Sequence, residues 1–305
     1  MQRYIVKRIL QGMLTLVGLS LVVFILSRAG GDPVPLLVGF DAPEEVREAK
    51  RQELGLDKSW PNQYWIFVKD AVRGDFGDSV FYDEPAIDVV MDRLPNTVKL
   101  VAVAAAFGIP IGLLLGILCA IRRNKALDIL GRTLAVAGQS LPGFWIGIML
   151  ILLFSVRWQV LPAGGMGGPS HYVLPPIAMA AFLVAGITRL TRSSMLEVLG
   201  SDYITFARAR GTPESLVIVK HALRNAAIPV LTFTAPIVAA MLANTVVVET
   251  VFAWPGVGRL AYDSALGKDF AVIQLIVLLF GSLLIFVNLL TDILYAWIDP
   301  RIRYQ

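Results

Sequence analysis

The sequence has few of the side chains that build disulfide or metal sites, and it has few charges. It contains one cysteine, Cys119, and two histidines, His171 and His221, which stand fifty residues apart. A single cysteine excludes a disulfide framework and a Cys-x-x-Cys metal site, and the histidine spacing excludes a local His-x3-His site. Only 16% of the 305 residues are charged, whereas soluble domains carry about 25%. We therefore expect no metal site and no catalytic residue.

Nucleotide-binding and nucleophile motifs are missing as well. No Gly-x4-Gly-Lys-Ser/Thr loop occurs, and Gly267-Lys268 is followed by Asp269. Ser140 does not lie in a Gly-x-Ser-x-Gly elbow, because Pro142 stands where the second glycine is needed. The net charge of +4 is too small to indicate a nucleic-acid partner. The chain is thus expected to hydrolyse no ATP and to bind no cofactor itself.

What the sequence has in abundance is apolar residues, at 56% of the chain with a mean hydropathy of +0.68. Residues 9–26 form the first apolar run, about 27 Å of helix, which is enough to cross a bilayer. A signal peptide has a shorter apolar core and a small-residue cleavage site, where this chain has Arg28. We predict an all-α polytopic membrane protein, with residues 1–29 forming the N-terminal end and first span. Five further spans are expected at about 97–121, 134–156, 173–190, 228–251 and 272–298.

Residues 30–96 differ from the rest, with fourteen acidic and seven basic side chains and several aromatic ones. Pro43 with Gly55, and Pro61 with Gly74, mark two short helices. We predict a small folded domain between the first two spans.

Three glycines in the second span, Gly108, Gly112 and Gly116, recur every four residues and so share one helix face. Small residues at this spacing let helices approach closely in lipid. The alternative is a loosely packed helix that bends around Pro110.

Residues 202–225 are the one polar, cation-rich passage in the apolar second half. We predict two short helices, the first capped by Asp202 and ended by Gly211 in the left-handed conformation. Thr212 would cap the second, with Pro213 at its first position. One face of the first helix would hold Tyr203, Phe206, Ala207 and Arg210, and the apolar face of the second Leu216, Val219 and Leu223. A solvated loop of two amphipathic helices would look the same.

Cations are concentrated on one side of the predicted spans, which by the positive-inside rule is cytoplasmic. Both termini and residues 202–225 would therefore be cytoplasmic, and residues 30–96 extracytoplasmic. The fifteen cations on that side are Arg3, Lys7, Arg8, Arg122, Arg123, Lys125, Arg132, Arg189, Arg192, Arg208, Arg210, Lys220, Arg224, Arg301 and Arg303.

The passage Ala207–Gly211, followed by His221–Pro229, resembles the loop by which permease subunits of ABC importers dock on their ATPase subunits. Ala207 and Gly211 match that motif, whereas Thr205 and Phe206 replace its usual Glu and Ala. Motifs along the whole chain resemble the dipeptide, oligopeptide and nickel branch of this family. They lie at 31–33 (GDP), 54–64 (LGLDKSWPNQY), 74–79 (GDFGDS), 139–145 (QSLPGFW), 249–256 (ETVFAWPG) and 299–304 (DPRIRY).

The resemblance implies the type I ABC importer permease fold, with six transmembrane helices, in the cell inner membrane. It implies a second permease subunit, two subunits that bind ATP and Mg, and an extracytoplasmic binding protein, which residues 30–96 are expected to touch. Peptides would be the substrates, or else nickel or another small solute. A self-sufficient secondary transporter is the competing class, but it should show paired intramembrane charges, and only Asp292 is present.

Two sets of site residues follow from these interpretations. The pathway candidates are polar residues within the spans, where an unpaired polar group is costly. Glu249 could receive an amino group or a cation, or instead cap the turn at Trp254–Gly256. The pathway set is Gln139, Ser140, Asn244, Thr245 and Glu249. The ATPase-coupling set is Tyr203, Ala207, Arg208, Arg210, Gly211, Lys220, His221, Arg224 and Asn225.

Overall fold

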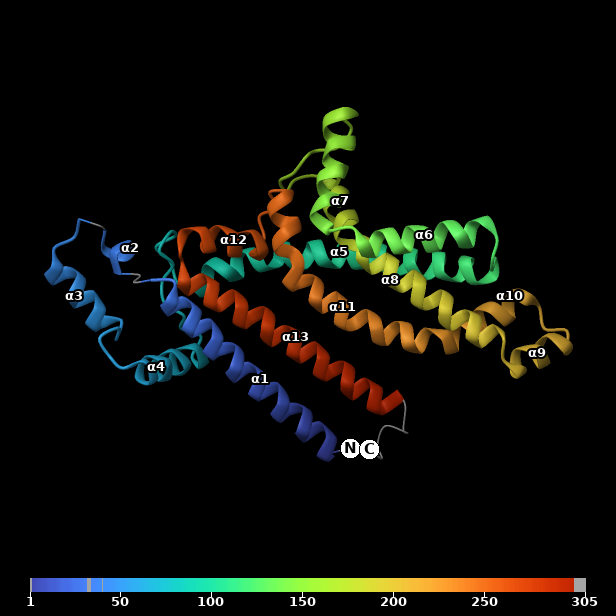
Figure 1. Ribbon diagram of the computed structural model, residues 1–305, viewed down its shortest axis with the longest axis horizontal. Coiled ribbons are helices and arrows are strands. Elements are labelled where there is room, and N and C mark those ends of the chain that lie inside the picture. The colour runs from blue at the N-terminus through green and yellow to red at the C-terminus, as the bar shows by residue number, and fades with distance from the viewer. Residues whose placement is uncertain (1, 32–33, 40, 299–305) are drawn as a thin grey trace. The chain divides into compact units, whose positions relative to one another are not determined.

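The computed structural model describes residues 2–31, 34–39 and 41–298, and the regular elements in these ranges are all helical (Figure 1). The predicted tail at 299–305 lies outside the described residues. Two π-helical segments lie at Ile151–Arg157 and Val217–Leu223, and a 3-10 turn lies at Pro169–Tyr172. The α-helices are α1 Gln2–Ala29, α2 Val34–Val38, α3 Glu44–Glu53, α4 Trp60–Val72, α5 Ala86–Ile121, α6 Ala126–Ser140, α7 Gly143–Leu150, α8 Leu174–Leu199, α9 Asp202–Ala209, α10 Glu214–Leu216, α11 Arg224–Val251, α12 Val257–Gly267 and α13 Phe270–Ile298.

Five helical stretches in the described part of the chain are long and apolar enough to cross a membrane. They are Val6–Ala29, Ala86–Ile121, Pro169–Leu199, Glu214–Ala243 and Phe270–Thr291. Each contains or overlaps one of the six predicted spans, so the all-helical membrane class is confirmed.

The remaining predicted span, 134–156, is not one straight helix. It is divided between α6 and α7, which are bent by 107° where they meet. Leu141 takes an extended conformation with ψ 133°, as the residue before a proline tends to do, and Pro142 has no N–H to continue the α6 ladder. The bent pair can count as the sixth span.

The chain divides into two compact units, residues 1–97 with 255–305, and residues 98–254. In the first unit α1 and α13 run side by side (Figure 1). Their contact is close, since a Cβ on Gly281 would lie within 2.2 Å of Leu19, and Gln274 donates a 2.6 Å hydrogen bond to Ser27 between the helices. The segment between α4 and α5 is attached to the residue before α13 by a buried hydrogen bond of 2.5 Å, which the Ser79 hydroxyl donates to Asp269.

In the second unit α8 is the central helix, packed by α5, α6, α7 and α11. The predicted close packing of the second span is confirmed, because a Cβ on Gly108, Gly112 or Gly116 would meet α8. The shortest approaches would be 3.1 Å to Leu183, 2.8 Å to Ile187 and 2.5 Å to Thr191. Small residues therefore let α5 lie directly on α8, as expected for helices in lipid.

A buried ion pair joins α6 to α8 at the end of this unit. Asp128 is fully buried, and both of its oxygens accept from Arg192, Oδ1 at 2.5 Å from Nε and Oδ2 at 2.9 Å from Nη2. The backbone N–H of Asn124 donates to the same carboxylate at 2.8 Å. Arg132 lies 3.6 Å from Asp128, but its side chain is half exposed. The carboxylate thus depends mainly on Arg192 for charge compensation.

We expect Arg192→Ala to destabilise the protein by about 3–5 kcal/mol, because it leaves a buried carboxylate without its bidentate partner. Arg132→Ala is the matched control, and as a half-exposed pair it should cost no more than about 1 kcal/mol. Thermal unfolding of both variants in the same detergent measures the difference. Equal shifts in Tm would show that Asp128 does not depend on Arg192.

Candidate functional site

The loop between α8 and α11 holds the predicted coupling residues. Its first helix, α9, begins at Asp202, and the cap position is held by Ser201 with extended φ and ψ of −79° and 154°. The prediction that Asp202 is the cap is therefore wrong by one residue. The Ser201 hydroxyl does not cap the helix either, since it donates to the carbonyl of Val198 at the end of α8. The sequence signal was misread because Ser and Asp, which both favour this position, are adjacent.

Gly211 ends the first helix in the left-handed conformation, with φ of +77°, as predicted. The N–H of Gly211 donates to Arg208, and the N–H of Thr212 donates to Ala207, which closes the turn. The second helix begins one residue later than predicted. Pro213, with φ −56° and ψ 138°, occupies the cap position instead of Thr212, and α10 starts at Glu214.

The second arm of the loop packs only partly through the predicted face. Leu216 and Val219 are 45% and 62% exposed, whereas Leu223 is half-buried against the core that holds the buried Val217 and Ala222. The reason is that residues 217–223 are π-helical, and side chains five apart then share a face. A spacing of three and four residues, which holds for an α-helix, selects Leu216 and Val219 instead. Val217 and Ala222 instead pack with Ile204 of α9 and Ala226 of α11.

Three of the predicted coupling residues are linked by hydrogen bonds. Asn225 donates to the Tyr203 hydroxyl at 2.8 Å and to the carbonyl of His221 at 3.1 Å, and the Tyr203 hydroxyl lies 3.4 Å from the same carbonyl. These bonds fasten α9 to the start of α11 across the turn at Gly211. The two arms of the loop are therefore one connected structure.

The loop also exposes large apolar and cationic side chains. Phe206 is 64% exposed, and the Arg210 guanidinium lies 5.4 Å from the centre of its ring. Arg208 donates two hydrogen bonds to Glu214, at 3.1 Å and 2.7 Å, and these raise the pKa of Arg208. The remaining predicted residues of this set are Ala207, which is half-buried, and Lys220 and Arg224, which are exposed.

The predicted pathway residues are not gathered at one place. Gln139 is half-buried and Ser140 exposed at the end of α6, where the bend to α7 begins. Asn244 of α11 is exposed and lines a cavity of about 420 Å³ beside that bend, together with apolar residues that include Pro142, Phe144 and Phe182. The structure therefore relates Asn244 to the bend next to Ser140.

Thr245 and Glu249 are fully buried, so neither side chain reaches a surface of the single chain. The carbonyl of Glu249 accepts a 2.8 Å hydrogen bond from the N–H of Trp254, which is itself fully buried and stacks edge-on against Tyr172. That bond is accepted by the backbone of residue 249, so both interpretations of the Glu249 side chain stay predictions.

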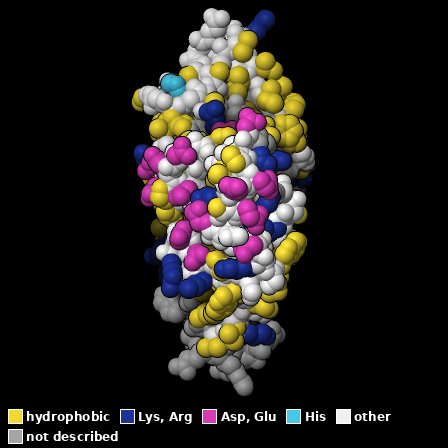
Figure 2. Space-filling view, turned by 90° about the vertical axis from the view of Figure 1, so that its left-hand side faces the viewer, with side chains coloured by type: hydrophobic (Ala, Val, Ile, Leu, Met, Phe, Trp, Pro, Cys, Tyr) yellow, Lys and Arg dark blue, Asp and Glu magenta, His cyan; other side chains and the backbone are white. Residues whose placement is uncertain are grey.

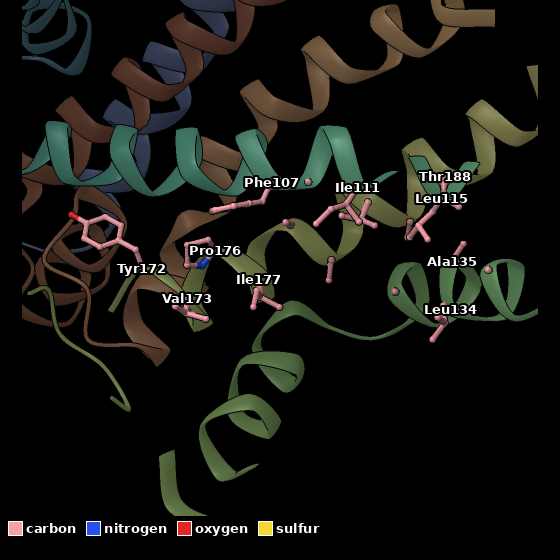
Figure 3. A pocket seen from close by; sticks show the side chains of 17 residues that line it. Phe107, Ile111, Leu115, Leu134, Ala135, Tyr172, Val173, Pro176, Ile177 and Thr188 are labelled. Atoms are coloured by element: carbon pink, nitrogen blue, oxygen red, sulfur yellow. The ribbon is translucent and has the colours of Figure 1, made fainter. Parts of the chain in front are cut away.

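A larger cavity of about 550 Å³ lies between α5, α6 and α8 (Figure 3). Phe107, Ile111, Leu134 and Ile177 are among the side chains that surround it, and its lining is almost entirely apolar. Among the described residues no group of three or more His, Cys, Asp or Glu side chains is placed to hold a metal ion.

The fold is that of the type I ABC importer permeases. The inward-facing MetNI methionine ABC transporter matches with a TM-score of 0.57 and 19% identity, covering 69% of this chain and 96% of that chain. An amino acid ABC transporter matches with a TM-score of 0.50 and 15% identity, over 68% of this chain and 92% of the other. At these identities the likeness concerns the fold alone.

The sequence places the chain within a family of this class. The binding-protein-dependent transport system inner membrane component matches residues 112–304, and the N-terminal domain of that membrane component matches residues 1–101. The chain belongs to this family. It is 41% identical over 306 residues to the glutathione transport system permease protein GsiC of Escherichia coli K12, and 40% identical to that of Shigella boydii serotype 4, covering 100% of each chain.

The turn at Gly211 provides a test of the loop geometry. A Cβ at Gly211 would meet nothing within 4 Å, so a substitution is opposed by the backbone conformation alone. Gly211→Val should cost about 1–3 kcal/mol, whereas Gly211→Asn should be tolerated, because Asn adopts the left-handed conformation more readily. We expect trypsin to cut the Val variant faster at Arg208 and Arg210. Equal cutting rates in the two variants would contradict the assigned conformation.

Proposed function

We propose that the chain forms half of the translocation pathway of an ATP-driven importer for peptides, which a binding protein delivers. The observation that carries this is the match of the whole chain to a family of binding-protein-dependent permeases, on a fold shared with ABC importers. Full-length relatives at 41% identity are glutathione permeases, which supports a peptide-like substrate. Nickel or another small solute remains the second candidate, on the resemblance to the peptide and nickel branch.

The exposed loop is proposed as the docking element for the ATPase subunits. ATP and Mg would be bound by those partners, because this chain has no nucleotide-binding motif. A helical element in a partner's groove holds best through apolar anchors, and Phe206 and Val219 are exposed apolar side chains of this kind. Arg210, Lys220 and Arg224 are available to acidic groups on the partner.

The connection of the loop to α11 would transmit a movement of the loop to the membrane-spanning helices. The π-helical segment continues into α11 without a break, and the hydrogen bonds of Asn225 tie α9 to the same point. A displacement of α9 would therefore carry the start of α11 with it. Since α11 packs along α8 and lines the cavity at Asn244, the same displacement would reach the proposed pathway.

The assembly that this function needs is a second permease subunit, two ATPase subunits and the binding protein. We propose an orientation with both termini and the loop in the cytoplasm, supported by the fifteen cations on that side. The segment 30–96 would then face the binding protein. Acidic side chains with Lys and Arg among them gather on the face seen in Figure 2, and Glu44, Glu45 and Glu48 of α3 are exposed.

Serine substitutions at Phe206 and Val219 test the docking proposal. Phe206→Ser and Val219→Ser should reduce the ATPase activity stimulated by the loaded binding protein roughly tenfold each, as expected for loss of a contact worth about 1.4 kcal/mol. Ser215→Ala, at an exposed position of the same loop, is the control and should leave that activity unchanged. Unchanged stimulation in both serine variants, with normal amounts in the membrane, would reject the proposed docking face.

Cysteine labelling tests the pathway, with Cys119 replaced by serine. Cysteine at position 244 should react with a small, membrane-impermeant thiol reagent, and the rate should change when the ATPase subunits bind nucleotide. Cysteine at position 245 is the matched control on the same helix, since Thr245 is fully buried, and it should stay unreactive. Absence of labelling at 244 in every nucleotide state would assign Asn244 to a helix contact.

A further inference from the structure

Helix α4, in the acidic segment between the first two spans, packs against the membrane-spanning helix α1. The hydroxyls of Tyr64 and Ser20 are 2.8 Å apart, and the Tyr64 hydroxyl lies 3.5 Å from the carbonyl of Val17. The Phe24 ring contacts Tyr64 edge-on at 5.4 Å between centroids and Phe67 at 5.9 Å. A domain that stood clear of the membrane would not contact the middle of a span in this way.

The position of these contacts along α1 gives their depth. Ser20 precedes the end of α1 at Ala29 by nine residues, which is about 14 Å of helix. Half of a bilayer's hydrocarbon core is about 15 Å thick. The Tyr64 hydroxyl therefore reaches well into the half of the membrane nearest Ala29. Phe24, which lies nearer to Ala29 than Ser20 does, contacts both Tyr64 and Phe67, so α4 lies against the part of α1 that leads to Ala29.

The exposed side chains of α4 have the composition of an interfacial helix. Trp60 is 58% exposed and Trp65 is 69% exposed, so two indoles lie on the surface of an otherwise acidic segment. Exposed Lys58 and Lys69 flank them. Indoles favour the boundary between headgroups and acyl chains, and lysine stems can extend from there to the phosphates.

We propose that α4 is an interfacial membrane helix, which inserts Trp60 and Trp65 among the lipid headgroups and upper acyl chains. The occupant beside these tryptophans is the bilayer, because α4 adjoins the spanning helix α1, on which Leu14 and Leu21 are exposed as well. The segment 30–96 is then held at the membrane surface at two points, by α4 against lipid and by Ser79 against Asp269. The proposal requires that α1 spans the membrane, and it does not depend on the substrate or on the docking loop.

Spin labels at single cysteines test this proposal in the complete complex. The complex, with Cys119 replaced by serine, is reconstituted in vesicles of phosphatidylethanolamine and phosphatidylglycerol. Labels are placed by Trp65→Cys and, independently, by Trp60→Cys, and the control label by Val46→Cys on the exposed face of α3. Collision with oxygen reports lipid, and collision with a water-soluble nickel chelate reports water. The ratio of oxygen to nickel collisions should be several-fold higher at positions 60 and 65 than at position 46.

Two other outcomes would overturn the proposal. Nickel access at 60 and 65 equal to that at 46 would place α4 in water. A label that is immobile and reached by neither reagent would show that another protein subunit covers this face. Because both tryptophans are more than half exposed, the substitutions remove little buried packing. The second position provides the measurement if one variant does not assemble.

Discussion

In hydrocarbon no water is present to satisfy backbone N–H and C=O groups, so a spanning segment must pair them within its own helix. Most of this chain obeys that constraint through long uninterrupted helices. The regular α-helical ladder is interrupted at the break between α6 and α7 and is replaced by π-helical pairing at 151–157 and 217–223. Irregular backbone at membrane depth is tolerated where it lines a water-filled cavity, and the break adjoins the cavity that Asn244 lines. The π-helical segment forms part of the loop proposed to meet the ATPase subunits. The break and the π-helical segment 217–223 thus coincide with a proposed function.

Features that depend on local sequence were predictable. Apolar runs of about twenty residues predicted the membrane-spanning helices, because length and hydropathy alone decide whether a helix can cross a bilayer. The four-residue spacing of Gly108, Gly112 and Gly116 gave the face that packs on α8, although not the identity of the neighbour. Gly211 gave the left-handed turn, since few other residues adopt that conformation without strain. The predicted starts of the helices that begin at Asp202 and Glu214 were each wrong by one residue, because neighbouring Ser, Thr, Asp and Pro all suit a helix start.

Features that depend on partners distant in sequence were not predictable. In the sequence Asp128 is one acid between Lys125 and Arg132, and only the fold brings it to Arg192. The buried face of residues 217–223 follows from the π-helical period, and no sequence pattern here predicts that period. The position of α4 against α1 depends on Tyr64 meeting Ser20, forty-four residues away, whereas composition alone predicted only a small folded domain between the first two spans. For Glu249 the sequence allowed a substrate contact or a structural turn, and it did not indicate that this side chain is completely buried.

The packing of the second unit also indicates where a change of shape would be concentrated. The loop is fused to the membrane part through a core in which Ile204 and Val217 pack with Met195 of α8 and Ala120 of α5. Glycine contacts lock α5 to α8, and the Asp128–Arg192 pair locks α6 to α8. Close-packed interiors transmit strain rather than absorb it, so these helices should move as one body. The rigid connection ends at Leu141–Pro142, where the hydrogen-bond ladder of α6 stops and α7 turns away by 107°. The cavity beside Asn244 lies at this junction, and a displacement of the loop would therefore change the shape of the proposed pathway there before it changed the packed core.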